Sequence, residues 1–187
     1  MSRVVIFSSG AGTNAENIIR SLRGVRGIVF PFVLSNRGDS LVHERARRLG
    51  VPSYSFSRAQ FEDGTVLSFL LGSGIDFIVL AGFLLKIPVG LLQAYPDRII
   101  NIHPSLLPKF GGLGMYGMRV HEAVVMSGER ESGITIHYVN ERYDEGRIIF
   151  SAKCDILPGD TAEDVSRKVH ALEYAHYPKV IERLVGL

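Results

Sequence analysis

An asparagine and a histidine stand two residues apart in the run that begins at Asn101 and includes His103 and Pro104. At the end of a predicted strand, residues two apart project from the same face. Pro104 restricts His103 to an extended backbone, which helps to hold its imidazole in place. An amide can stabilise negative charge on a carbonyl oxygen, and an imidazole can move a proton. A lone histidine is usually structural, but this pair predicts acyl transfer through an oxyanion.

Asp144, two residues before Gly146, is a third candidate for chemistry. An aspartate close before a glycine ordinarily forms a turn. If its hairpin packs beside the strand that ends at His103, the carboxylate would instead pair with the imidazole. That pairing would raise the pKa of His103 and keep it a proton donor. His137, on the preceding predicted strand, is expected near the same site.

A glycine-rich loop, Gly10 to Ala15, follows the first predicted strand and leads into a helix. Glycines let the backbone approach an anion, and free N–H groups at a helix start favour phosphate. The loop also fits the Gly-x-Gly-x-x-Ala fingerprint of dinucleotide-binding proteins. That fingerprint needs an acidic residue about 20 positions later, where this chain has only Arg37 to serve an NADP-type ligand. An NADP-dependent oxidoreductase, a non-enzymatic binding module and a plain turn all stay open.

Composition limits the class of protein. The 187 residues, 46% of them hydrophobic, fit one globular domain and exclude a disordered chain. The single cysteine, Cys154, excludes a disulfide scaffold. No apolar run is long enough for a membrane helix, and the first residues lack a signal-peptide core. We therefore expect a cytoplasmic protein that does not associate with membranes.

Charge is distributed unevenly along the chain. The net charge of +2 is too small to indicate nucleic-acid binding. However, residues 1–60 contain nine arginines and only three acidic residues, which favours an anionic ligand near this part. The histidines show no metal-ligand spacing, so no metal is expected.

Alternating strands and helices predict a single α/β domain with a mostly parallel, mixed sheet of about seven strands flanked by helices. Pro31 is expected to bend the second strand or to place it at a sheet edge, and Pro178 to kink or break the last helix. Ligands bind beyond the carboxyl ends of such strands, so the loops after Phe7, Leu80 and Ile102 are candidates. The predicted strands are residues 3–7, 28–34, 52–56, 76–80, 98–102, 133–139 and 147–152, and the predicted helices are residues 15–22, 40–49, 59–71, 88–94, 120–126 and 162–184.

These motifs together resemble the folate-dependent formyltransferases, over nearly the whole chain. The most specific run is Asn-x-His-Pro-Ser-Leu-Leu-Pro-Lys at residues 101–109. The resemblance implies a Rossmann-like formyltransferase fold and direct transfer of a formyl group from 10-formyltetrahydrofolate, with no metal and no covalent acyl carrier. The Gly-Thr-Asn loop is similar to that of members that bind a ribose phosphate. It implies 5-phosphoribosylglycinamide, an intermediate of purine biosynthesis, as the acceptor.

The resemblance also implies roles for particular residues. The catalytic set would be Asn101, His103 and Asp144. The acceptor would be bound by Gly12, Thr13 and Asn14 at its phosphate and by Glu173 at another part. The folate would be bound by Leu84, Leu85, Lys86 and Ile87, together with Asn101. The three apolar members of the folate set could equally be core residues, and Glu173 a solvated acid. The partners implied are these small molecules, with the protein a monomer or a homodimer.

Two positions depart from the family pattern. Many members carry a folate-contacting arginine near the position of Gly64, where this chain has none and only Arg58 stands close. The loop Gly111–Met118 is longer than usual and does not begin with Pro-Gly. The resemblance therefore assigns no role to this loop.

Overall fold

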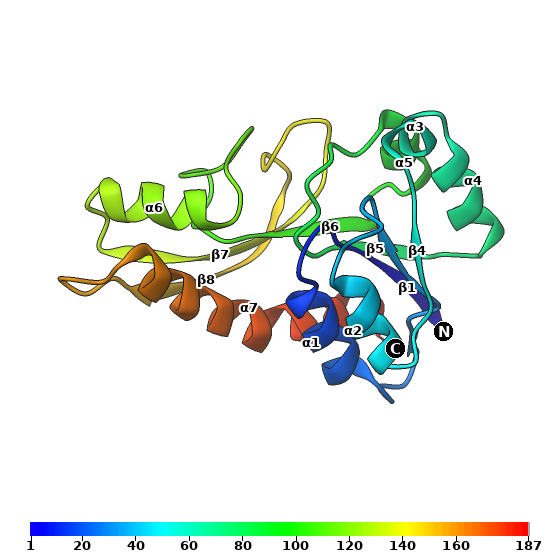
Figure 1. Ribbon diagram of the computed structural model, residues 1–187, viewed down its shortest axis with the longest axis horizontal. Helices are drawn as coiled ribbons and strands as arrows, with labels where there is room; N and C mark the ends of the chain where they lie inside the picture. Colours follow the sequence, from blue (N-terminus) through cyan, green and yellow to red (C-terminus); the bar gives the residue numbers. More distant parts are fainter. Residues whose placement is uncertain (187) are drawn as a thin grey trace.

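A twisted sheet forms the centre of the molecule (Figure 1), in a computed structural model that describes residues 1–186. Its strands follow the order β4-β3-β1-β5-β6-β7-β8, with β2 beside β1. All pairs up to β6 are parallel, whereas β6–β7 and β7–β8 are antiparallel. The strands are β1 (Ser2–Phe7), β2 (Ile28–Val29), β3 (Val33–Ser35), β4 (Ser53–Ser55), β5 (Phe77–Leu80), β6 (Ile99–His103), β7 (Glu131–Tyr138) and β8 (Ile148–Asp155).

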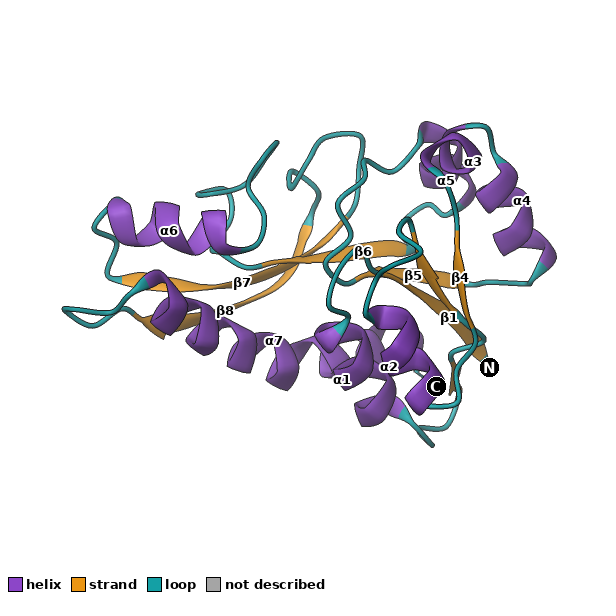
Figure 2. Ribbon diagram, viewed as in Figure 1, coloured by secondary structure: helices purple, strands orange, loops and turns teal. Residues whose placement is uncertain are grey.

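Helices cover both faces of the sheet, as Figure 2 shows. Side chains alternate along β1, so Val4 and Ile6 join the apolar core with α1, α2 and α7, and Val5 and Phe7 join the core with α3, α4 and α5. The helix α6 packs along α7. The helices are α1 (Thr13–Leu22), α2 (Val42–Arg48), α3 (Arg58–Glu62), α4 (Thr65–Gly72), α5 (Val89–Ala94), α6 (Met118–Met126) and α7 (Ala162–Val185).

The mixed α/β architecture confirms the predicted fold class, with two local corrections. The strand expected at residues 28–34 is divided by Pro31 into β2 and β3, so the sheet has eight strands rather than about seven. The single helix expected at residues 59–71 is wrong, because it is broken into α3 and α4 at Gly64, whose φ of 90° no helix can contain.

The last helix runs without a break through Pro178, so of the expected kink or break the break is wrong. A proline has no N–H and leaves the carbonyl four residues earlier without its helical donor. That carbonyl belongs to Tyr174, and the Asn17 side chain of α1 donates to it at 3.1 Å. The lost helical bond is thus replaced by a contact between helices.

Close packing of the hairpin β7–β8 makes Gly133 irreplaceable. A Cβ atom there would lie 2.0 Å from the Ala152 carbonyl oxygen and 2.8 Å from Leu106 Cδ2. We therefore expect Gly133→Ala to lower the free energy of unfolding by about 3 kcal/mol or more, at the upper end for overpacked sites.

The matched control is Gly72→Ala, at a helical position where the new Cβ meets nothing within 4 Å. It should raise the free energy of unfolding by up to about 1 kcal/mol. Urea denaturation of both variants measures the difference. Equal stabilities would show that the hairpin can widen to accept a methyl group.

The strand order reverses between β1 and β5. The chain first places β3 and β4 on one side of β1 and then returns to place β5 and β6 on the other. Loops at the carboxyl ends of these strands therefore diverge and leave a crevice. Within residues 1–186, no helix is long and apolar enough to cross a membrane.

Candidate active site

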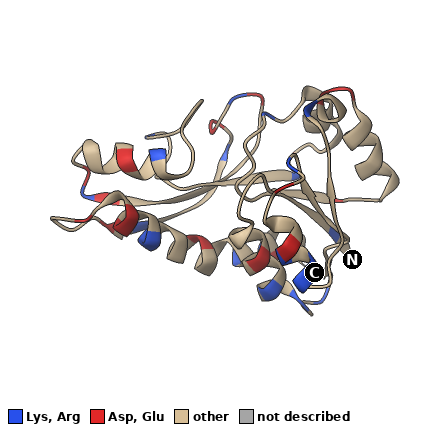
Figure 3. Ribbon diagram, in the orientation of Figure 1, with Lys and Arg blue, Asp and Glu red and all other residues tan. Residues whose placement is uncertain are grey.

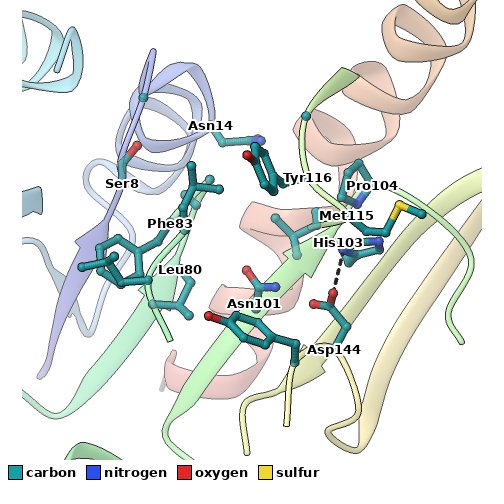
Figure 4. A pocket seen from close by; sticks show the side chains of 18 of the residues that line it. Ser8, Asn14, Leu80, Phe83, Asn101, His103, Pro104, Met115, Tyr116 and Asp144 are labelled. Atoms are coloured by element: carbon teal, nitrogen blue, oxygen red, sulfur yellow. Dashed lines mark ion pairs between the residues drawn. The ribbon is translucent and has the colours of Figure 1, made fainter. Parts of the chain in front are cut away.

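One cavity of about 480 Å³ lies at this strand reversal (Figure 4). The loops after β1, β5 and β6 all line it, as expected, and the segment Gly112–Met118 forms a further wall. Its volume is in the ordinary range for small-molecule sites. The close-up places Asn14 at the β1 side, and Asn101, His103 and Asp144 at the β6 side.

The imidazole of His103 is buried between two acceptors. Its Nδ1 lies 3.4 Å from Asp144 Oδ2, and its Nε2 donates to the Phe110 carbonyl oxygen at 2.7 Å. The contact with Asp144 arises because β7 pairs with β6 and its hairpin returns Asp144 to the end of β6. Asp144 has a φ of 57°, so it is a turn residue as well as a partner of His103.

Burial lowers the pKa of His103 below its usual value and outweighs the Asp144 carboxylate and the Phe110 carbonyl, which both raise it. The expected net rise is therefore wrong, although Asp144 acts in the expected direction. Burial alone would raise the pKa of Asp144, but the contact with the His137 imidazole, the charge of His103 and the Gly112 N–H hold it below its usual value. At neutral pH, Asp144 is ionised and His103 is mostly neutral.

His137 orients Asn101 across the antiparallel strand pair. Its Nδ1 donates to the Tyr138 carbonyl at 2.9 Å, which leaves Nε2 to accept from Asn101 Nδ2 at 3.3 Å. The same Nε2 lies 3.6 Å from Asp144 Oδ1. The expectation that His137 lies near the site is confirmed.

The segment after β6 is held against Asp144 and Thr135. Gly112 N–H donates to Asp144 Oδ2 at 2.9 Å. A Cβ atom at Gly111 would lie 2.5 Å from Leu107 Cδ2 and 3.3 Å from Asp144 Cβ, so the loop backbone passes close to both side chains. Thr135 accepts from the Leu107 N–H at 3.0 Å. This segment thus supplies the Gly112 N–H as a donor to Asp144 and the Phe110 carbonyl as an acceptor for His103.

The backbone from Gly10 to Asn14, here called the anion loop, presents unused donors to the cavity. Among the described residues, none of its N–H groups donates to another residue. Gly12 has a φ of 72° and precedes the first turn of α1. Free amides at a helix N-terminus bind phosphate. Arginines gather on the neighbouring α2 (Figure 3), which adds positive potential near this loop.

Asn14 joins the anion loop to α7. Its Nδ2 donates to Glu173 Oε2 at 2.9 Å, and His170 Nδ1 bonds the same oxygen at 2.6 Å. This hydrogen bond to Glu173 raises the pKa of His170. Glu173 is 4% exposed and lines the cavity, so it is not a solvated acid. Asn14 Oδ1 is buried without a partner among residues 1–186, which leaves it free to accept from a ligand.

Four of the five residues expected to contact folate, those of the segment Leu84–Ile87, border the cavity on its β5 side, and Asn101 lies on the β6 side. Leu84 is 48% exposed, so it is not a core residue, whereas Ile87 is buried in the apolar core and also reaches the cavity wall. The Leu84 N–H donates to the Ser9 hydroxyl at 3.0 Å, which fixes this segment to the end of β1.

Two polar groups at this site gave no signal in the sequence. The Phe110 carbonyl is a backbone atom, and its approach to His103 depends on the loop path. His121, on α6, is 3% exposed and lines the cavity, and burial lowers its pKa. Its Nδ1 has no partner among the described residues.

The chain belongs to the formyl transferase family, whose model matches residues 2–181. The phosphoribosylglycinamide formyltransferase of Bacillus subtilis is 36% identical over 194 residues, covering 100% of this chain and 96% of that protein. The chloroplastic phosphoribosylglycinamide formyltransferase of Arabidopsis thaliana is 42% identical over 187 residues. That match covers 96% of this chain but 64% of the plant protein, so the chain spans less than two thirds of this relative's length.

Solved structures agree with the sequence relatives. The crystal structure of glycinamide ribonucleotide transformylase 1 from Geobacillus kaustophilus is 35% identical, covers 100% of both chains and superposes with a TM-score of 0.89. Family membership gives no support to the NADP-dependent oxidoreductase. In agreement, Arg37, the residue that such an enzyme would need, pairs with Asp39 at 3.0 Å in an exposed position.

Proposed function

We propose that this chain transfers a formyl group from 10-formyltetrahydrofolate to the amine of 5-phosphoribosylglycinamide, in purine biosynthesis. One observation carries the proposal: the anion loop and the Asn101–His103–Asp144 set line the same cavity. The family supports formyl transfer, and the names of the relatives support this acceptor.

The reaction begins when the acceptor amine attacks the formyl carbon and forms a C–N bond. The formyl oxygen becomes negative and accepts hydrogen bonds from Asn101 Nδ2 and from the N–H at His103 Nε2. Nε2 donates to the Phe110 carbonyl in this structure, so the formyl oxygen must replace that acceptor. The imidazolium, which is the minor form of His103 at neutral pH, donates this bond through Nε2 while its Nδ1–H faces Asp144 Oδ2.

The proton lost by the amine must reach the folate nitrogen N10, which leaves as the C–N10 bond breaks. The imidazolium of His103 relays it: Nε2 gives its proton to N10 and takes up the proton of the amine, and the Asp144 carboxylate, 3.4 Å from Nδ1, stabilises this charged form. The products are the formylated amine and tetrahydrofolate, so atoms and charge balance without a covalent enzyme intermediate.

The remaining contacts follow from the cavity walls. The backbone and apolar surface of Leu84–Ile87 bind the folate pterin, and Glu173 binds the polar part of the acceptor near Asn14. The cytoplasmic location and the choice between a monomer and a homodimer stay predictions from the sequence.

A spectrophotometric assay of tetrahydrofolate formation tests the function, with 5-phosphoribosylglycinamide as the acceptor. Steady turnover that requires both substrates is expected. Binding of both without turnover would favour a non-enzymatic binding module. Turnover that depends on NADP, with no formylated product, would favour the oxidoreductase.

The folate's glutamate tail should be held weakly. No arginine stands near Gly64, and the Arg58 guanidinium is bound to Glu62 at 2.7 Å on its own exposed helix. Exposed ion pairs contribute about 0.2–1 kcal/mol, so lengthening the tail from one to five glutamates should change the donor KM by less than about fivefold. Arg58→Gln should leave this small dependence unchanged. A strong preference that Arg58→Gln abolishes would show that Arg58 binds the tail.

A further inference from the structure

The anion loop has a fixed polarity. Its first three carbonyl groups all point into the protein: Gly10 O accepts from the Ser40 hydroxyl at 2.6 Å, Ala11 O accepts from Arg45 Nε at 2.7 Å, and Gly12 O accepts from the Glu16 N–H at 2.9 Å. With the carbonyls bound on that side, the N–H groups are left for a ligand.

Two of these three donors are side chains supplied by α2 and the residues that lead into it. Ser40 is 8% exposed, and its oxygen also accepts from the Val42 N–H at 3.4 Å. A Cβ atom on Gly12 would lie 2.6 Å from Val42 Cβ, so this segment touches the loop backbone directly. Arg45 also pairs with Glu16 of α1. The α2 segment is therefore the rigid support of the loop.

We propose that Ser40 and Arg45 are positioning residues for the acceptor's phosphate. They act through the loop, because neither is among the described residues that line the cavity. Without these donors, the Gly10 and Ala11 carbonyls can turn toward the ligand, where an oxygen dipole repels phosphate. This inference rests on the proposed function only in that the phosphate belongs to the acceptor.

Arg45 differs from the other arginines of its helix. Arg48 carries the same charge and stands one turn away at 62% side-chain exposure, and it pairs with Glu44 of its own helix. If arginines merely attract an anion over a distance, replacing Arg45 or Arg48 should raise the acceptor KM equally. If the orientation of the loop carbonyls decides phosphate binding, only replacing Arg45 should raise it.

The first experiment measures acceptor KM in three variants. Ser40→Ala removes a neutral hydrogen bond without changing charge, and KM should rise about fivefold. Arg45→Gln removes a charged donor, and KM should rise about tenfold or more. Arg48→Gln, the matched control, should change KM less than twofold. In all three, kcat and the donor KM should stay within twofold of the wild-type values.

The second measurement separates positioning from general damage to the fold. With an acceptor that lacks the phosphate, Ser40→Ala and the wild type should have the same KM, because the loop then has no anion to bind. Ser40→Thr retains the hydroxyl and should restore most of the affinity for the phosphorylated acceptor. Equal losses with both acceptors, or equal losses in Arg45→Gln and Arg48→Gln, would overturn the proposal.

A third measurement does not require formyl transfer. Inorganic phosphate is titrated into the isotope-labelled protein while the amide resonances of Gly10 to Asn14 are followed by NMR. These amides should shift on binding, and Ser40→Ala should weaken phosphate binding about fivefold. A wild-type protein that shows these shifts but transfers no formyl group would refute the proposed function and leave this inference standing. Absence of the shifts in the wild type, or equal affinity in both proteins, would refute the inference.

Discussion

Asp144→Asn should lower kcat by about 10²–10⁴, the usual value of positioned proton transfer, while both substrates still bind and the fold is retained. Asparagine matches aspartate in size and also tolerates the left-handed backbone that Asp144 adopts, with its φ of 57°. The substitution therefore removes the charge and preserves the turn. A turn residue without a catalytic role would give near-normal activity.

The loss has an electrostatic cause that can be followed by pH. Burial already lowers the pKa of His103, and Asp144 is the largest opposing influence. Without that carboxylate the pKa of His103 falls further, so the imidazolium that relays the proton becomes harder to form. In the plot of kcat against pH, the limb that follows the titration of His103 should therefore move to lower pH in Asp144→Asn.

A double-mutant cycle tests whether the two residues act together. His103→Asn should cost a similar factor, and the double variant should lose much less than the product of the two single losses, because groups that act as one unit are not additive. Circular dichroism of each variant controls for folding. Fully multiplicative losses would mean that Asp144 and His103 act independently.

The sequence predicts those parts of the site that depend on local chain geometry. Asn101 and His103 share one face because of strand alternation, and the loop from Gly10 is free to bind an anion because of its glycines and the helix that follows. The helix break at Gly64 also has a signal in the sequence, because Asp63-Gly64 is a dipeptide typical of turns. The apolar pattern continues on both sides of this dipeptide, however, and it favours a single helix.

The sequence predicts much less where a contact depends on distant pairing. Asp144 reaches His103 only because β7 pairs with β6, and no local pattern separates this role from a plain turn. The pKa of His103 depends on how deeply the final fold buries it. Ser40 and Arg45 likewise look like an ordinary helix start and an ordinary basic face until the carbonyls they bind are seen.

Removing the phosphate from the acceptor should raise its KM at least about a hundredfold. The anion loop offers several free N–H groups, and a hydrogen bond to a charged group contributes about 1.5–3 kcal/mol. Losing two such bonds costs about 3 kcal/mol or more, which exceeds a factor of a hundred in affinity. The kcat for the bound, unphosphorylated acceptor should fall less, because in the proposed mechanism Asn101, His103 and Asp144 act on the reacting atoms and not on the phosphate.

Salt separates direct binding of this phosphate from attraction by the arginine-rich surface. Screening at an ionic strength of about 0.5 M nearly abolishes interactions between exposed charges several ångströms apart, whereas hydrogen bonds at a partly enclosed loop are screened much less. The phosphorylated acceptor should therefore keep most of its advantage in KM at that salt concentration, with a non-phosphate salt used to set it. Inorganic phosphate should compete with the phosphorylated acceptor and leave the KM of the unphosphorylated one unchanged. If both acceptors had equal KM values in high salt, the Gly10–Asn14 backbone would be only a turn, and the positive surface would account for the whole preference.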